Sequence, residues 1–365
     1  MLMNKILGRG CCIVLCLLPV ACGSGASATG GGGSGGASGS SGTAASAGMF
    51  SGGGSPTAGL GGSSGSAGAA GMAPAPCTTH CPVDLLTGVD GPWGLAVDSG
   101  FAYVLLLSES TVMRVPLAGG AAQRVTSVQY GSAGRDGIAV DGSNVYLTVS
   151  GGGTHAGVLK APIAGGVANY LVQDAIQPEM LRADSTNVYW STQNSLSGVP
   201  IGGGDPIPLA HEALTTFTRI AIDSSYIYWS ESPEFGGYSV KRVTLAPGGQ
   251  IEILATGLTA VSDLEVDDKN VYVLVNLDLL KIPIAGGDPV KVVPKLGTSM
   301  VLDGDQVYAT NDTSVLKVAK SGGTPTVLAT AQTRATSITV DATSIYWLDQ
   351  GSVLAADGAV RKLGK

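Results

Sequence analysis

Apolar and polar positions alternate along most of the chain in a recurring unit. In each unit an alternating apolar segment ends in an Asp, and a Tyr follows that Asp five residues later inside a second apolar segment. Successive Asp residues of the pattern are separated by 43, 43, 39, 44, 36 and 38 positions. A period of about 40 residues built from short apolar segments predicts one four-stranded β-propeller blade per unit. The seven pairs are Asp98 with Tyr103, Asp141 with Tyr146, Asp184 with Tyr189, Asp223 with Tyr228, Asp267 with Tyr272, Asp303 with Tyr308, and Asp341 with Tyr346.

Each unit divides into four predicted strands, which we call a to d in chain order. Strand a ends in the repeat Asp, as at residues 94–97, strand b holds the Tyr, strand c runs into a Gly-Gly pair, and strand d follows. Strand b is apolar at consecutive positions, as in Val188, Tyr189 and Trp190, so both faces of its sheet must be covered. In a propeller each blade is packed between two others. We therefore predict an all-β fold, a seven-bladed β-propeller of four-stranded antiparallel blades over residues 77–365.

The residues that recur in every unit have structural roles in this interpretation. The Asp lies before a tight a–b turn, where its carboxylate can accept backbone N–H groups. The Tyr is expected in the core, with its hydroxyl satisfied at the blade edge. Gly-Gly supplies the positive φ of the c–d turn and is not a phosphate-binding loop, because no helix follows it. In the seventh unit Asp357 and Gly358 take the place of Gly-Gly.

A closed ring requires that its two ends be joined. Residues 83–87 read Val-Asp-Leu-Leu-Thr and match strand d of the other units, for example residues 251–256. We predict that they form the outer strand of the last blade and so fasten the N-terminal to the C-terminal end of the ring. Residues 359–363 are a second candidate for the same place, so that one of the two segments must be displaced or stack outside the other.

The first 21 residues have the organisation of a secretory signal peptide. Lys5 and Arg9 precede an apolar run at residues 11–20 that is too short to cross a bilayer, and Ala21 stands directly before Cys22. Cys22 resembles the lipidated cysteine of bacterial lipoproteins. An ordinary cleaved signal with an incidental cysteine is the alternative. We expect lipidation at Cys22 and, because the next residue is Gly and not Asp, anchoring to the outer membrane.

Residues 22–76 form a predicted lipid-anchored tether. From residue 23 onward this segment is almost entirely Gly, Ser, Ala and Thr without a charged residue, so we expect it to be disordered. Cys77 and Cys81 follow it, and a Cys-x3-Cys pair in an exported chain predicts a local disulfide. A metal site with His80 is the weaker alternative, because it would be one ligand short. We expect no metal and no cofactor.

The charge of the chain bears on its partners. The chain has 20 basic and 27 acidic residues, and loss of two cations with the signal peptide would change the net charge from −7 to −9. This balance disfavours nucleic acid, whose phosphates require basic patches. We expect a monomer that reaches the membrane through the lipid anchor only. Its partner is then an unknown ligand of the envelope or the exterior: a glycan, a peptide or a protein.

Three strand-b segments carry a resemblance to known propellers. Residues 188–192 (Val-Tyr-Trp-Ser-Thr), 227–231 (Ile-Tyr-Trp-Ser-Glu) and 345–349 (Ile-Tyr-Trp-Leu-Asp) resemble the Tyr-Trp-Thr-Asp blades of low-density-lipoprotein-receptor-type propellers. Residues 77–98 resemble the start of the propeller in Gly-rich-tethered lipoproteins of myxobacteria. The resemblance implies a YWTD- or NHL-like propeller from residue 77 to the C-terminus. Four of the seven units lack the Trp and the receptor family has six units, so receptor-type ligand binding does not follow.

Loop lengths locate the candidate binding face. The Asp-to-Tyr distance never changes, whereas the distance from the Tyr to the first Gly of the c–d turn varies from 14 to 20 residues. The b–c and d–a connections of an up-and-down blade emerge on one side, where a rigid scaffold carries its binding residues. A solvated acidic rim is the alternative interpretation of this face. The candidates are Trp93, Asp136, Glu179, Arg219 and Asp263 before strand a, and Tyr130, Arg135, His155, His211, Glu212, Glu231, Glu234, Phe235 and Tyr238 on the longer loops.

Two classes of function are compatible with these residues. The first is a non-catalytic binding or interaction module, and the alternative is a propeller-type lyase or hydrolase with its site on the same face. An enzyme needs a base that works near neutral pH, and the blades offer only His155 and His211, with Glu212 nearby. No nucleophile motif or metal-binding carboxylate cluster accompanies them. The sequence therefore favours the binding module.

Overall fold

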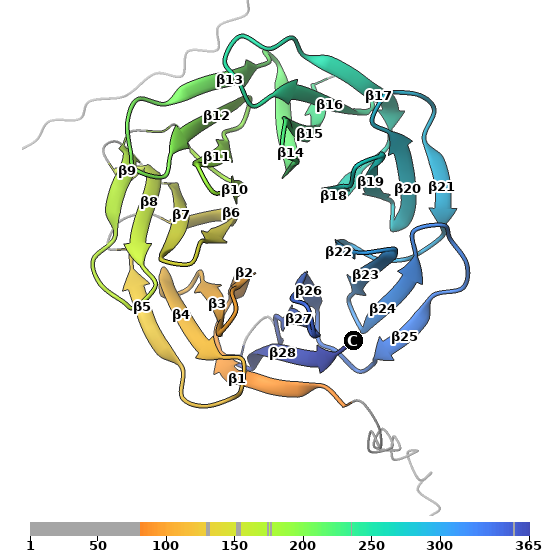
Figure 1. The fold of residues 1–365 in the computed structure, drawn as a ribbon. Helices are drawn as coiled ribbons and strands as arrows, with labels where there is room; N and C mark the ends of the chain where they lie inside the picture. The colour runs from red at the N-terminus through yellow and green to blue at the C-terminus, as the bar shows by residue number, and fades with distance from the viewer. Residues whose placement is uncertain are drawn as a thin grey trace, which may run out of the picture. The chain divides into compact units, whose positions relative to one another are not determined.

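The computed structural model describes residues 81–365, except 129–131, 151–154, 174, 176, 235 and 353–354. This part of the chain forms seven four-stranded antiparallel sheets, which stand as blades around a central channel (Figure 1). The predicted seven-bladed propeller of four-stranded blades is therefore confirmed. The predicted signal peptide, the tether, Cys22 and Cys77 lie outside the described residues, so the lipid anchor and the disulfide stay predictions.

The two inner strands of each blade are strands a and b of the repeat. The innermost strands are β2 (Pro92–Val97), β6 (Ser132–Val140), β10 (Leu181–Ala183), β14 (Thr215–Ile222), β18 (Val261–Val266), β22 (Ser299–Asp303) and β26 (Ala335–Val340). The second strands are β3 (Phe101–Leu106), β7 (Asn144–Ser150), β11 (Asn187–Ser191), β15 (Tyr226–Pro233), β19 (Asn270–Val275), β23 (Gln306–Asn311) and β27 (Ser344–Asp349).

The two outer strands of each blade are strands c and d. The third strands are β4 (Thr111–Pro116), β8 (Gly157–Pro162), β12 (Ser195–Pro200), β16 (Tyr238–Thr244), β20 (Asp278–Pro283), β24 (Ser314–Ala319) and β28 (Gly358–Gly364). The outermost strands are β5 (Gln123–Ser127), β9 (Asn169–Gln173), β13 (Ile207–His211), β17 (Glu252–Leu258), β21 (Val290–Val293), β25 (Thr326–Ala329) and β1 (Val83–Val89). In the described chain no helix is long and apolar enough to span a membrane.

The apolar core lies between the blades. Seven clusters of buried side chains each join one blade to its neighbour; in one of them Tyr228 of β15 packs with Leu264 of β18. Val188, Tyr189 and Trp190 of β11 are all buried, which confirms that both faces of the second strand are covered. Apolar burial on both faces of every sheet is what stabilises the ring.

The five-residue offset between the repeat Asp and Tyr has a direct structural cause. In the first blade the Asp98 Oδ1 accepts hydrogen bonds from the backbone N of Gly100 and Phe101, each at 2.7 Å. The Asp98 Oδ2 accepts one from the Tyr103 hydroxyl, also at 2.7 Å. The same Asp–Tyr bond forms at Asp141, Asp184, Asp223 and Asp341. The prediction that the repeat Asp orders the a–b turn, with the Tyr hydroxyl satisfied at the edge, is confirmed for these blades.

Lysines from the next blade reach the repeat Asp in the two remaining blades. The Lys320 Nζ, just after β24, donates to the Asp267 Oδ2 at 2.9 Å, and the Lys365 Nζ, just after β28, donates to the Asp303 Oδ2 at 2.6 Å. Each lysine therefore ties one blade to the preceding one. These ion pairs belong to the scaffold.

Glycine occupies the positive φ of the c–d turns, as predicted. The first Gly of all six Gly-Gly pairs has a positive φ, for example 87° at Gly119. The prediction that Asp357 and Gly358 stand in for the seventh pair is wrong. Gly358 begins β28, the third strand, so these two residues end the b–c connection. The seventh blade has no c–d turn, because its outer strand comes from the other end of the chain.

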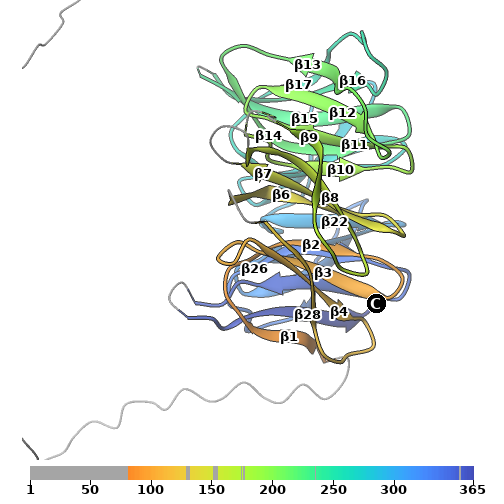
Figure 2. The ribbon, with the colours of Figure 1, turned by 90° about the vertical axis from the view of Figure 1, so that its left-hand side faces the viewer.

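The ring is closed by β1, which pairs antiparallel with β28 on the outside of the last blade (Figures 1 and 2). The predicted place of residues 83–87 is thus confirmed. The expectation that residues 359–363 compete for this place is wrong, since they lie in β28, one strand further in. Arg361 of β28 fastens the closure through its ion pairs to Asp84 of β1 at 3.0 Å and to Asp349 of β27 at 3.2 Å.

Candidate functional site in the central channel

The b–c and d–a connections lie at the same end of the blades, which we call the mouth face. In the first blade the Leu107 N, after β3, donates to the Gly91 O, before β2, at 3.1 Å. In the last blade the Gly351 N donates to the Thr333 O, also at 3.1 Å. The loops whose lengths vary between units therefore surround one opening of the channel.

A cavity of about 240 Å³ opens on the mouth face. Three of the residues predicted for this face meet there: Trp93 at the start of β2, Arg219 on β14 and Asp263 on β18. Hydroxyl and amide side chains complete its lining. They belong to Ser262, Thr298, Ser299, Thr336, Ser337 and Gln350.

Asp263 is fixed in place by the backbone of its own strand and of the next blade. The Asp263 Oδ2 accepts a hydrogen bond from the Met300 N of β22 at 2.7 Å, and its Oδ1 accepts one from the Leu264 N at 2.9 Å. The Arg219 Nε lies 4.0 Å from the Asp263 Oδ1. Asp263 is only 9% exposed. This carboxylate therefore joins the fifth and sixth blades and lies beside the Arg219 guanidinium at the mouth.

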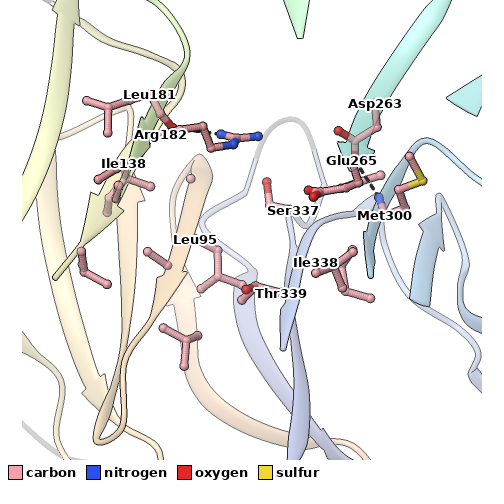
Figure 3. A pocket seen from close by; sticks show the side chains of 18 residues that line it. Leu95, Ile138, Leu181, Arg182, Asp263, Glu265, Met300, Ser337, Ile338 and Thr339 are labelled. Carbon is pink, nitrogen blue, oxygen red and sulfur yellow. Dashed lines mark hydrogen bonds between the residues drawn. The ribbon is translucent and has the colours of Figure 1, made fainter. Parts of the chain in front are cut away.

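A second cavity of about 310 Å³ lies deeper in the channel and is continuous with the mouth, because both are lined by Asp263, Ser299 and Ser337. Its walls come from six of the seven innermost strands: β2, β6, β10, β18, β22 and β26. Most of the residues that line it are small or apolar, but polar atoms make up the larger part of its exposed surface. Two charged side chains stand out from it, Arg182 of β10 and Glu265 of β18, which point into the cavity from opposite sides (Figure 3).

Glu265 has an unusual protonation equilibrium. Burial raises the pKa of Glu265 to about 7, while the positive charge of Arg182 lowers it and the negative charge of Asp263 raises it further. Protein atoms surround the carboxyl group, but the side chain keeps partial exposure to the open channel. Removal from bulk water disfavours the charged form, and no nearby cation outweighs this effect. Glu265 therefore changes its charge close to neutral pH.

The other residues predicted for the mouth face are not all at the channel. Glu179 precedes β10 and takes part in hydrogen bonds through its backbone: its O accepts from the Thr148 Oγ1 at 2.5 Å and its N donates to the Ser191 O at 2.8 Å. Tyr238 begins β16 and packs against the core between the fourth and fifth blades. Phe235 and the side chain of Asp136 lie outside the described residues.

The two histidines of the blades stand on exposed positions. The His155 O accepts a hydrogen bond from the Tyr170 hydroxyl at 3.1 Å. His211 ends β13 and lines a separate cavity of about 430 Å³ between the second and third blades, together with Trp190 and Gln177. Neither histidine lines the channel cavities.

Glu212, the neighbour of His211 in the chain, is engaged in a network of ion pairs. The Lys241 Nζ contacts the Glu212 Oε1 at 2.8 Å and the Glu231 Oε1 at 2.7 Å. Glu231 is buried and also accepts a hydrogen bond from the Trp229 Nε1 at 3.0 Å. Glu212 therefore serves a structural ion-pair network. Across the described residues no group of three or more His, Cys, Asp or Glu side chains is arranged to hold a metal ion.

Arg182 and Glu265 were missed by the sequence analysis, although a signal for them exists. Both stand two positions before the repeat Asp of their units. The other five units place an uncharged residue there, so an alignment of the seven units marks these two as exceptions. The five are Ala96, Ala139, Ala221, Val301 and Thr339.

Comparisons with known proteins identify the fold and nothing narrower. No protein-family model matches the chain, and no curated protein matches it. The structure is similar to virginiamycin B lyase from Staphylococcus aureus, with 12% identity, a TM-score of 0.59 and coverage of 78% of this chain and 98% of that chain. It is also similar to YCF48 bound to D1 peptide, with 12% identity, a TM-score of 0.56 and coverage of 78% and 95%. BamB from Moraxella catarrhalis gives 16% identity, a TM-score of 0.51 and coverage of 74% and 84%. At these identities the likeness shows the propeller fold alone.

Proposed function

We propose that this chain is an exported lipoprotein of the cell envelope whose propeller is a non-catalytic binding module. The observation that carries the proposal is the mouth cavity, where Trp93, Arg219 and Asp263 meet a ring of hydroxyl groups at the opening of the channel. An aromatic ring, a cation and several hydroxyls suit a polar ligand of the envelope or the exterior, such as a glycan, a peptide or a protein segment. The YCF48 structure, which has the same fold, is a complex with a peptide.

The proposed location of the protein is inferred from its N-terminal residues. The signal peptide, Cys22 and the uncharged tether support a lipid anchor in the outer membrane, and the closed ring supports a monomeric binding domain. Replacement of Cys22 with Ser tests the anchor. The wild-type chain should incorporate labelled palmitate and sediment with membranes, and the variant should do neither. Labelling of the variant would show that Cys22 is not the anchor.

Trp93 offers a direct test of the binding site. It is half-buried at the mouth, whereas Trp190, Trp229 and Trp347 are buried between blades. Titration of the protein with envelope glycans, peptidoglycan fragments and peptides should therefore change tryptophan fluorescence through Trp93. The change should disappear in Trp93→Phe, and Arg219→Ala should weaken binding about tenfold.

The control is the separate cavity between the second and third blades. His211→Ala alters that cavity and should leave both the fluorescence change and the affinity as they are. A ligand whose signal persists in Trp93→Phe and is lost in His211→Ala would contradict a site at the mouth.

A further inference from the structure

The charges of Arg182 and Glu265 serve no need of the propeller itself. The same position of the repeat holds Ala96, Ala139 and Ala221 in three other blades, which shows that a small side chain there is compatible with the blade. The two charged residues belong to the third and fifth blades and are not neighbours in the ring. A requirement common to all blades would recur in the other units, as the repeat Asp does.

The protein leaves the hydrogen-bonding capacity of both groups largely unused. The Arg182 Nη1 donates to the backbone O of Leu181 at 2.9 Å, and none of the ion pairs found among the described residues involves Arg182. The Glu265 carboxylate accepts no hydrogen bond from any described residue. A guanidinium has five N–H donors and a carboxylate about four acceptor sites, and charged groups removed from water are unfavourable unless they find partners.

The space between the two charges has the size and lining of a small-ligand site. Its volume of about 310 Å³ is at the lower end of the range for such pockets, roughly 300–1,000 Å³. Leu95 contributes apolar surface, together with the small exposed part of Ile338, and Ser337 contributes a hydroxyl near the passage to the mouth (Figure 3). This space fits a small ligand that consists of two charged groups and a few further heavy atoms.

We propose that the deeper cavity binds a small zwitterion of the free amino acid class, with its carboxylate at Arg182, its ammonium at Glu265 and its side chain against Leu95 and Ile338. The proposal rests on the proposed binding function and names the ligand of that channel. A simple anion at Arg182 would face the carboxylate of Glu265, and a simple cation at Glu265 would face the guanidinium of Arg182. Only a molecule with both a negative and a positive group can compensate the charges of Arg182 and Glu265 at the same time.

The binding should depend on pH through Glu265. The charged groups around it are Arg182 across the cavity and Asp263 on its own strand, with Arg219 next to Asp263. The pKa of Glu265 is about 7 in the empty cavity, so the carboxylate that receives the ammonium is mostly protonated below neutral pH. Affinity should therefore fall as the pH falls below about 7.

Calorimetric titration of the mature full-length chain with each common amino acid, at millimolar concentration and about pH 8, tests the proposal. At least one amino acid should bind. Its N-acetyl derivative, which lacks the ammonium, and its amide, which lacks the carboxylate, should each bind about tenfold more weakly or worse.

Two variants test the residues, and two matched controls test the variants. Arg182→Ala and Glu265→Gln should each weaken binding about tenfold or more, since each removes one charge-assisted contact. Arg182→Ala introduces the residue that three other blades carry, so it should fold. The same substitution types at exposed positions, Arg124→Ala and Glu109→Gln, should leave affinity unchanged.

Three results would overturn the inference. Capped derivatives that bind as well as the parent amino acid would exclude a zwitterion site, and so would undiminished binding by both channel variants. No binding of any common amino acid would also exclude it. If a glycan or peptide still gave the Trp93-dependent signal in that case, the proposed binding function would stand and only the ligand class would be wrong.

Discussion

Two sets of charged residues in this propeller behave in opposite ways. The repeat Asp residues lie at the a–b turns, occur once in every blade and have the same partners in five of the seven blades. Arg182 and Glu265 lie in the channel, at a position of the repeat that is uncharged in the other five units. Neither side chain forms a hydrogen bond or ion pair with another side chain of the described residues. In this propeller the residues that recur support the unit, whereas Arg182 and Glu265 depart from the repeat and face a cavity lined by six blades.

The same difference appears in the protonation equilibria of two carboxyl groups. Burial alone would raise the pKa of Asp341, but hydrogen bonds from Tyr346, Thr343 and Ser344 outweigh it and lower the pKa to about 2. Burial raises the pKa of Glu265 to about 7, because no hydrogen bond compensates for it. Partial burial with hydrogen-bond donors stabilises a charge, and burial without them destabilises it.

Removal of a repeat carboxylate should give the largest effect. Asp341→Ala leaves the N–H groups of Thr343 and Ser344 and the hydroxyl of Tyr346 without their acceptor. The variant should lose about 2–4 kcal/mol of unfolding free energy at neutral pH in urea denaturation. A loss below about 0.5 kcal/mol, the range of ordinary surface substitutions, would contradict the structural role of the repeat Asp.

The effect of Asp341→Ala should also depend on pH. The pKa of Asp341 in the folded protein, about 2, lies below its ordinary value of 3.8, so its contribution is present above about pH 4 and is lost as the pH falls through 2. The gap in unfolding free energy between wild type and variant should narrow over that interval. A gap that stays constant would show that charge plays no part in it.

Removal of the charge of Glu265 should act in the opposite direction. Ionisation of this buried carboxyl group opposes folding, so Glu265→Gln should raise the unfolding free energy by about 1–2 kcal/mol at about pH 8. This value already allows for screening of the charge by water in the open channel. Between pH 7 and 4.5 the carboxyl group of Glu265 is protonated in the folded protein and ionised in the unfolded chain, so the gain in unfolding free energy should shrink as the pH falls through this interval. Below pH 4.5 the gain should vanish. Glu109→Gln, at an exposed site, should show no such pH dependence.

Removal of Arg182 should have the smallest effect on stability. Arg182→Ala removes one hydrogen bond to the Leu181 O and introduces the side chain found in three other blades. The unfolding free energy should change by no more than about 0.5 kcal/mol, as expected for a residue outside the structural network. A loss of unfolding free energy above about 2 kcal/mol in the same urea assay would show that Arg182 is a structural charge, like the repeat Asp residues.

Much of the architecture could be predicted from the sequence because the information is local and repeated. The Asp–Tyr offset counts the blades, since each pair closes its own a–b turn within six residues, and residues 83–87 resemble an outer strand wherever they lie. The error at Asp357 and Gly358 has the same origin. A turn signal shows that the chain bends, but it does not show between which strands, and the last blade takes one strand from the far end of the chain.

The candidate site was only partly predictable. Trp93, Arg219 and Asp263 were expected on one face and do line one cavity, because loop-length variation follows from blade geometry. Glu179 and Tyr238 satisfied the same pattern but serve the backbone and the core. The pattern specifies the end of a strand, and the orientation of the side chain depends on the packing of the neighbouring blade.

By itself the sequence determined the number of blades, the a–b turns and the strand order within the first six blades, because short-range hydrogen bonds and alternating apolar positions need only neighbouring residues. Only the closed ring decided what lies in the channel. Arg182 and Glu265 are 83 positions apart and face one cavity because the innermost strands are wrapped around a common axis. The pKa of Glu265 likewise depends on the protein that surrounds it, since desolvation is produced by distant segments that fold against the residue and is not encoded in its neighbours along the chain.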